Sequence, residues 1–280
     1  MTLRSEIFLV VFAVLSAGCT DNLTVVDRAF DPSGAPFFDC LPNLDGSLEA
    51  NEFPLNLTGE GSYVVSPPGV TRAVNLDGAV DAAGRRVWPL GADFADDRLE
   101  TEGAVPVSDF WFAPSFPNAT FVLPSDRSGS LLAVYSVASD RLLLHGFASR
   151  DAMPAEGQTL LPYEAPVAAI RFPFAAGNRW TETGTVSEGM ALGLAYRGED
   201  TYDSTVVGAG TLELPDVTFT QAWQLQQTAT VAPAVGDPVT VSSVSFLFEC
   251  FGEVARATAP AGTPAPFSTA AELRRYSLRR

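Results

Sequence analysis

The sequence predicts an all-β fold, either an antiparallel β-sandwich or an open β-barrel, with two packed β subdomains as a further option. Segments rich in valine, threonine, tyrosine and phenylalanine recur along the chain, separated by turns that contain glycine, proline or aspartate. No stretch shows a sustained apolar pattern of helical period. The 21 prolines and 23 glycines supply frequent breaks, as short strands joined by turns require.

The expected strands fall into two regions. In the first, residues 61–163, strands are short and broken by proline-rich loops, whereas residues 164–258 form longer and more regular hairpins. Ser139-Asp140 and Glu188-Gly189 lie between strand-like runs and are predicted to be tight hairpin turns. The predicted strands are 62–66, 70–76, 86–90, 120–123, 131–137, 141–148, 167–172, 179–187, 191–197, 202–214, 219–230, 239–251 and 253–258.

The last region, residues 259–280, begins as a loop and ends in an arginine-rich segment. Residues 271–278 fit either a strand or a short helix, and we favour a strand that pairs with residues 253–258.

Charge and composition exclude several functions. The chain carries −16, and all 17 of its basic residues are arginine. The last nine residues carry +3, which leaves −19 for the rest, so no nucleic-acid partner is expected. Without lysine there is no Schiff-base chemistry, and one histidine, His145, cannot build a multi-histidine metal site. His145 is expected to be a strand residue that faces solvent or a polar neighbour, and we expect no enzyme.

The N-terminus carries an export signal. Residues 7–15 form an apolar run that follows Arg4 and is too short to span a bilayer. The run leads into Ser16-Ala17-Gly18-Cys19, which resembles a bacterial lipobox. The resemblance implies that residues 1–18 are a signal peptide and that Cys19 becomes lipid-modified, with a palmitate-type acyl chain on the new amino terminus. The alternative is an ordinary signal peptide that leaves Cys19 as a plain thiol.

The same resemblance implies a cellular location. Thr20 follows Cys19 where inner-membrane lipoproteins have aspartate, which implies an outer-membrane protein that faces the periplasm or the cell surface. Residues 19–60 would then serve as the tether that leads into the β domain.

Cys40 and Cys250 remain as a pair once Cys19 is modified. An even pair in an oxidising compartment predicts a disulfide. It would close a loop of about 210 residues, for which chain entropy gives on the order of 5 kcal/mol. The alternative is that both are buried free thiols.

Three aromatic segments carry a second resemblance. They are GRRVWPL at 84–90, FPNAT at 116–120 and FPFAAGNRW at 172–180. Together they are similar to an uncharacterised β-rich module of secreted and surface proteins of Gram-negative bacteria. The resemblance spans about residues 61–230, implies a packed β structure and implies no activity.

One segment has the spacing of a calcium loop. With Gly46 at position six, Asn43, Asp45, Glu49 and Glu52 fall at positions three, five, nine and twelve. Position one is leucine, where the loop needs a carboxylate. We therefore favour an Asp-Gly turn that leads into a short helix, with calcium as the only cofactor considered.

Two further acidic clusters are expected to be exposed and solvated. Asp93, Asp96 and Asp97 form the first, and Glu199, Asp200 and Asp203 form the second, in an expected hairpin turn. The tryptophans are expected mostly in the core, although they could also line a groove for a glycan or lipid. They are Trp88, Trp111, Trp180 and Trp223.

These observations favour a membrane-anchored lipoprotein that acts as a binding or structural module. Its partner, besides the membrane that holds the anchor, would be a protein, a lipid or a glycan. The first alternative is a carrier that holds an apolar ligand such as a lipid inside an open β-barrel. The second is a carboxylate-based glycan hydrolase, for which no pair among the 33 acidic residues stands out by spacing.

Overall fold

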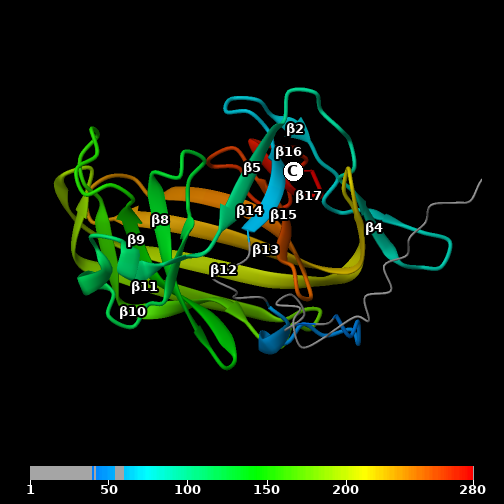
Figure 1. Cartoon of the computed structure of the whole chain (residues 1–280), viewed down its shortest axis with the longest axis horizontal. Coiled ribbons are helices and arrows are strands. Elements are labelled where there is room, and N and C mark those ends of the chain that lie inside the picture. Colours follow the sequence, from blue (N-terminus) through cyan, green and yellow to red (C-terminus); the bar gives the residue numbers. More distant parts are fainter. Residues whose placement is uncertain (1–39, 41, 54–59, 280) are drawn as a thin grey trace, which may run out of the picture. The chain divides into compact units, whose positions relative to one another are not determined.

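Fifteen strands form one large sheet, and 13 of them follow one another along a single path of antiparallel pairings (Figure 1). The computed structural model describes residue 40, residues 42–53 and residues 60–279. In order along the path, the strands are β5 (Arg98–Gly103), β1 (Glu60–Val65), β17 (Glu272–Ser277), β15 (Gly252–Thr258), β14 (Val239–Phe248), β13 (Thr218–Pro233), β12 (Leu194–Glu213), β11 (Arg179–Ala191), β10 (Leu160–Arg171), β9 (Arg141–Ser149), β8 (Leu131–Ala138), β7 (Phe121–Pro124) and β6 (Val105–Pro106).

The remaining elements are short. β3 (Ala79–Val80) pairs with β4 (Arg86–Pro89), which runs parallel to β12, while β2 (Arg72–Ala73) and β16 (Thr269–Ala270) form a second sheet. The helical elements of the described residues are 3-10 turns: η1 (Ala50–Glu52), η2 (Val107–Asp109) and η3 (Ala113–Ser115). The all-β prediction is confirmed. Within the described ranges, no helix has the length and hydropathy needed to cross a membrane.

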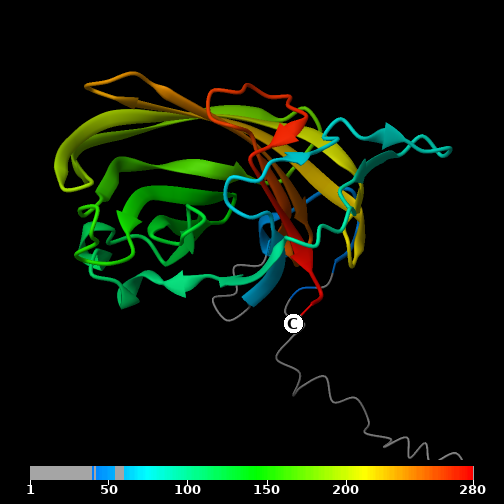
Figure 2. The same cartoon turned by 90° about the horizontal axis from the view of Figure 1, so that it is seen from above.

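The two ends of the strand path are neighbours in the sequence. β5 ends at Gly103 and β6 begins at Val105, so only Ala104 separates opposite edges of the sheet. The sheet must therefore curl until its edges approach. One core cluster accordingly joins Phe121 and Leu142 of β7 and β9 to Leu247 of β14, strands far apart along the path. The sheet is nearly closed, like the open barrel among the predicted options (Figure 2).

The sheet has an inner face, which points into the curl, and an outer face. Successive side chains of β14 alternate between them: Phe246 packs into the outer cluster with Trp88, and Leu247 packs into the inner one. Segments 66–97 and 259–271 cover the outer cluster and contribute Leu76 and Phe267 to it. Both faces are therefore buried along this part of β14.

One of the two predicted turns is confirmed and the other is wrong. Ser139-Asp140 joins β8 to β9, but Glu188-Gly189 lies inside β11, and the turn comes at Leu192-Gly193. The ladder shifts register between Val186 and Gly189, which is a bulge. A Cβ at Gly189 would lie 2.6 Å from the Val186 side chain. The glycine therefore provides room for a bulge within the strand, not for a turn.

The C-terminal strand is confirmed. β17 lies between β15 and β1, with Ala257 opposite Leu273 and Val65 opposite Arg274. The boundary expected between residues 163 and 164 lies inside β10, where the pairing with β9 shifts register between Pro162 and Val167. Pairing with β9 continues on both sides of that shift.

Candidate functional site

The end of the barrel at the β14–β15 turn is fastened to the segment that precedes β1. A disulfide joins Cys40 to Cys250 with a Cα–Cα distance of 5.5 Å, which confirms the predicted bridge. Cys250 lies in the turn after β14, where its φ is +65°. Cys19 and the predicted signal peptide, residues 1–18, lie outside the described residues, so the lipid anchor stays a prediction.

A buried carboxylate reinforces the same attachment. Glu249 is 1% exposed and accepts hydrogen bonds from the backbone N–H groups of Asn43 and Leu44, at 2.7 and 2.9 Å. Glu249 precedes Cys250 directly in the chain. The disulfide and the two hydrogen bonds to Glu249 therefore hold residues 40–44 at the same turn. Sequence reasoning missed Glu249 because nothing in its neighbourhood distinguishes it from a solvated acid.

The expected calcium residues are hydrogen-bonded to one another. Glu52 accepts from the Asn43 side-chain amide at 2.6 Å and from the Glu49 N–H at 2.9 Å, and the Ser47 N–H donates to Asp45 at 2.9 Å. The segment forms a turn followed by η1, as the favoured interpretation predicts. Burial raises the pKa of Glu52. No group of three or more metal-ligating side chains was found in the described part of the chain. Calcium binding stays a prediction.

The expectation that the first acidic cluster is solvated is wrong for Asp97, whereas the side chains of Asp93 and Asp96 are more than half exposed. Asp97 is buried and accepts hydrogen bonds from Arg72 and Arg275, while Asp96 also pairs with Arg72. Asp93, more exposed, pairs with Arg279. The cluster is neutralised because the fold brings the arginine-rich C-terminal strand against it.

The second acidic cluster is also not where the sequence placed it. Glu199, Asp200 and Asp203 lie within β12, which is paired on both sides, to β11 and to β13. Alternation along the strand exposes Glu199 and Asp203 but buries Asp200, which is 4% exposed. A buried carboxylate on the inner face therefore replaces the expected exposed turn.

His145 lies in β9 as expected and is buried, with its Nε2 2.6 Å from the Ser136 hydroxyl. Burial lowers its pKa, and its side chain has no carboxylate partner in the described part of the chain. The pair is therefore a satisfied polar contact and lacks the third member of a catalytic triad. Three of the four tryptophans are buried, as expected: Trp88, Trp180 and Trp223.

Ion pairs line part of the inner face. Arg256 bonds Glu253 at 2.6 Å, and on the neighbouring strand Arg274 bonds Glu102 at 2.5 Å. Arg256 and Arg274 are directly opposite each other in the β15–β17 ladder, so their side chains point the same way. The Arg274 guanidinium lies 3.9 Å from the centre of the Tyr63 ring. This stretch of the inner face is consequently charged rather than apolar.

A third ion pair joins separate parts of the curled sheet. Arg127, in the loop between β7 and β8, bonds Glu272 of β17 at 2.5 Å and also donates to the carbonyls of Pro67 and Ala271. β7 and β17 are far apart along the strand path. Arg127 therefore helps to hold the curled sheet together.

A buried aspartate and two tyrosines form a second polar group on the inner face. The Tyr163 hydroxyl donates to Asp200 Oδ2 at 2.5 Å and lies 2.7 Å from the Tyr202 hydroxyl. Asp200 Oδ1 is buried and has no hydrogen-bond partner within the described ranges. A Cβ at Gly184 would lie 2.6 Å from the Tyr163 ring, so the ring lies directly over the glycine backbone of β11. Burial raises the pKa of Asp200, although the Tyr163 hydrogen bond opposes this.

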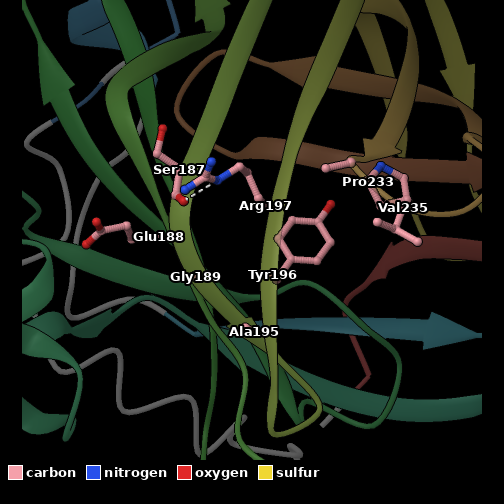
Figure 3. A pocket seen from close by; sticks show the side chains of 9 residues that line it. Ser187, Glu188, Gly189, Ala195, Tyr196, Arg197, Pro233 and Val235 are labelled. Atoms are coloured by element: carbon pink, nitrogen blue, oxygen red, sulfur yellow. Dashed lines mark hydrogen bonds between the residues drawn. The ribbon is translucent and has the colours of Figure 1, made fainter.

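A pocket of about 450 Å³ lies near this group, at the end of the barrel that carries the β11–β12 turn (Figure 3). Its walls come from residues 187–189 of β11, 195–197 of β12 and 233–235 at the end of β13. Arg197 points toward β11, where its Nε donates to the Ser187 carbonyl at 2.8 Å. Tyr196 points instead toward Pro233 and Val235.

Tyr196 lines the pocket and is also close enough to Asp200 for that charge to act on its pKa. A Cβ at Gly198 would lie 2.7 Å from the Tyr196 hydroxyl, so the phenol extends over Gly198. Tyr196, Gly198 and Asp200 alternate along β12 and share its inner face, and the Asp200 charge acts on the pKa of Tyr196. The pocket, the phenol and the carboxylate therefore follow one another along one strand.

No protein-family model matches the chain, and no match was found among curated proteins or solved structures. The function is therefore argued from the geometry above and from the sequence patterns. The resemblances to a lipobox and to a β-rich module stay predictions.

Replacing Asp200 with asparagine is expected to stabilise the protein at pH 8 by about 1–3 kcal/mol, because it removes a buried charge that lacks a partner. The folded-state pKa of Asp200 is raised, so the wild type binds this proton more tightly when folded. Its stability should thus fall as pH rises from the unfolded pKa through the folded one. Urea denaturation at several pH values should show the advantage of Asp200→Asn shrinking toward pH 4. An advantage independent of pH would contradict this.

Proposed function

We propose that the chain is an exported, lipid-anchored protein whose barrel acts as a binding module without enzymatic activity. The lipobox-like Ser16-Ala17-Gly18-Cys19 supports the anchor, and the Cys40–Cys250 disulfide fits an oxidising compartment outside the cytoplasm. Of the three functions that the sequence left open, this one agrees best with the geometry of the barrel.

The position of the pocket relative to the tether carries this proposal. Cys250 lies shortly after Phe248, the last residue of β14, whereas the pocket residue Val235 lies shortly before Val239, the first residue of that strand. A strand of 10 residues spans about 33 Å, so the tether and the pocket lie at opposite ends of β14. A module anchored through Cys19 would thus keep the pocket end free for a partner.

The side chains at the pocket end also support binding. Several large apolar residues there are exposed, and exposed apolar side chains that gather at one end of a domain are typical of contact sites. They come from the β9–β10 loop, the β11–β12 turn and the loop before β14: Met153, Leu192, Leu194, Val235 and Val239. The partner, a protein, a lipid or a glycan, would dock here.

The two alternative functions receive less support. An apolar ligand inside the barrel would have to lie against the ion pairs of Arg256 and Arg274, which are costly to desolvate. A glycan hydrolase needs two carboxylates at one cleft. Glu102, Glu253 and Glu272 are each paired with an arginine. The described polar partners of Asp200 are tyrosine hydroxyls and include no second carboxylate.

The anchor is tested by labelling with radioactive palmitate in a Gram-negative host. We expect the wild type to be labelled and to sediment with membranes, because acylation at Cys19 supplies the hydrophobic attachment. Cys19→Ser should lose both the label and the sedimentation, at least tenfold. Thr20→Ser is the matched control, since it changes the neighbouring residue but leaves Cys19 and the disulfide in place. Equal labelling of the wild type and Cys19→Ser would show that the proposal is wrong.

A further inference from the structure

Asp200 Oδ1 is buried without a hydrogen-bond donor among the residues that the structure describes. A buried acceptor without a partner costs about 1–3 kcal/mol, and more when it is charged. The Tyr163 hydroxyl already gives its hydrogen to Oδ2, and the Tyr202 hydroxyl can then donate to Tyr163. Neither phenol retains a hydrogen for Oδ1. A bound ligand can supply the missing donor.

The surroundings of Asp200 favour a cation as that donor. Tyr163 and Tyr202 share a core cluster with Tyr135, Phe147 and Tyr196. Among the described residues, no arginine forms an ion pair with Asp200, whose pKa responds to burial and to Tyr163. The faces of aromatic rings attract cations. The protein as a whole carries −16, so its field also attracts positive charge.

The end pocket offers a route to Asp200. Tyr196 lines the pocket, and its phenol extends over Gly198, which lies two residues before Asp200 on the same face of β12. Tyr196 is half-buried and packs at the edge of this cluster, and rotation of its side chain toward the pocket would open the way to Asp200. A ligand held in the pocket would then reach the Asp200 oxygen.

We infer that Asp200 and the end pocket form one binding site for an organic ligand with a primary or secondary ammonium group. The ammonium group donates to Asp200 Oδ1 among the tyrosine rings, and the apolar remainder of the ligand lies in the pocket against Pro233 and Val235. A quaternary ammonium group would satisfy the rings but has no hydrogen for Oδ1. This inference rests on the proposed binding function and specifies its ligand class.

Titration calorimetry of the full chain in detergent tests the site, with benzylammonium as the probe and benzyl alcohol as its neutral counterpart. We expect saturable binding of benzylammonium and at least tenfold weaker binding of the alcohol. Asp200→Asn should bind benzylammonium at least tenfold more weakly. Asp203→Asn is the matched control, since it removes the same charge from an exposed position on the other face of β12, and its affinity should stay within twofold.

The pH dependence gives a second readout. Benzylammonium should bind more tightly at pH 8 than at pH 5, because only the ionised Asp200 can accept its hydrogen bond. Denaturation curves show separately that Asp200→Asn is folded. Equal affinity of Asp200→Asn and Asp203→Asn, or no binding to the wild type, would overturn the inference. Either result leaves the anchor proposal untouched, because palmitate labelling depends on Cys19 and not on Asp200.

Discussion

Replacing Asp97 with alanine is expected to lower the free energy of unfolding by about 3–5 kcal/mol. Asp97 accepts from Arg275 at 2.5 Å and from Arg72 at 2.8 Å, and its own side chain is 3% exposed. Arg275 is fully buried, so without Asp97 its charge would remain in the core with only the carbonyls of Leu90 and Ala92 as acceptors. Urea denaturation followed by tryptophan fluorescence measures the change.

Asp96→Ala is the control for this prediction. Asp96 pairs with the same Arg72 at 2.6 Å, but its side chain is 54% exposed. Solvent screens such a pair, and we expect a loss of about 1 kcal/mol or less. If both variants lost the same stability, burial of the Asp97–Arg275 pair would not be what stabilises this end of the sheet.

Removing the disulfide is the second change with a large expected effect. The bridge closes a loop with a sequence separation of 210, and the loss of its restraint on the unfolded chain corresponds to about 5 kcal/mol. The double variant Cys40→Ser with Cys250→Ser should therefore unfold at a much lower urea concentration than the wild type. Without the bridge, the backbone at Asn43 and Leu44 would still be held by its two hydrogen bonds to Glu249, but no longer by a covalent bond.

Reduction of the wild type provides an independent measurement. Dithiothreitol should shift the wild-type midpoint to that of the double variant and leave the double variant unchanged. A wild-type midpoint that does not respond to reductant would show that the bridge contributes little to stability. Since Cys19 is unaffected in both proteins, the lipid anchor does not enter this comparison.

The C-terminal arginines show how far composition alone can mislead. In the sequence they form a positive tail on an acidic body. In the fold, Arg274 pairs with Glu102, Arg275 with Asp97 and Arg279 with Asp93, all acids far earlier in the chain. Pairing of β17 with β1 brings these arginines to residues 93–102, and no local pattern encodes that contact.

The strands could be predicted largely because their signals are local. Alternating apolar residues and turn residues predict the all-β class, the turn at Ser139-Asp140 and the final strand, and all three are confirmed. The disulfide could be predicted from cysteine count and compartment, since Cys40 and Cys250 are the pair that remains after Cys19. These conclusions need no knowledge of which strands lie side by side.

The candidate site depends on pairing instead. Aspartate and glycine are uncommon in strands, so Gly198-Glu199-Asp200 looks like a turn. It is a strand because β11 and β13 bond β12 on both sides, and alternation then points Asp200 inward to Tyr163 of β10. A carboxylate becomes buried or solvated according to which face its strand presents.

By itself, the sequence determined the strand content, the last strand and the cysteine pair. Only the tertiary structure decided the curl of the sheet around Ala104, the buried anchor at Glu249 and the unpartnered oxygen of Asp200. The physical reason is the difference in sequence separation between the interactions that determine each feature. Backbone propensity acts over a few residues, whereas bulges and strand order, which set the face and neighbours of each side chain, arise from contacts between residues far apart in the chain.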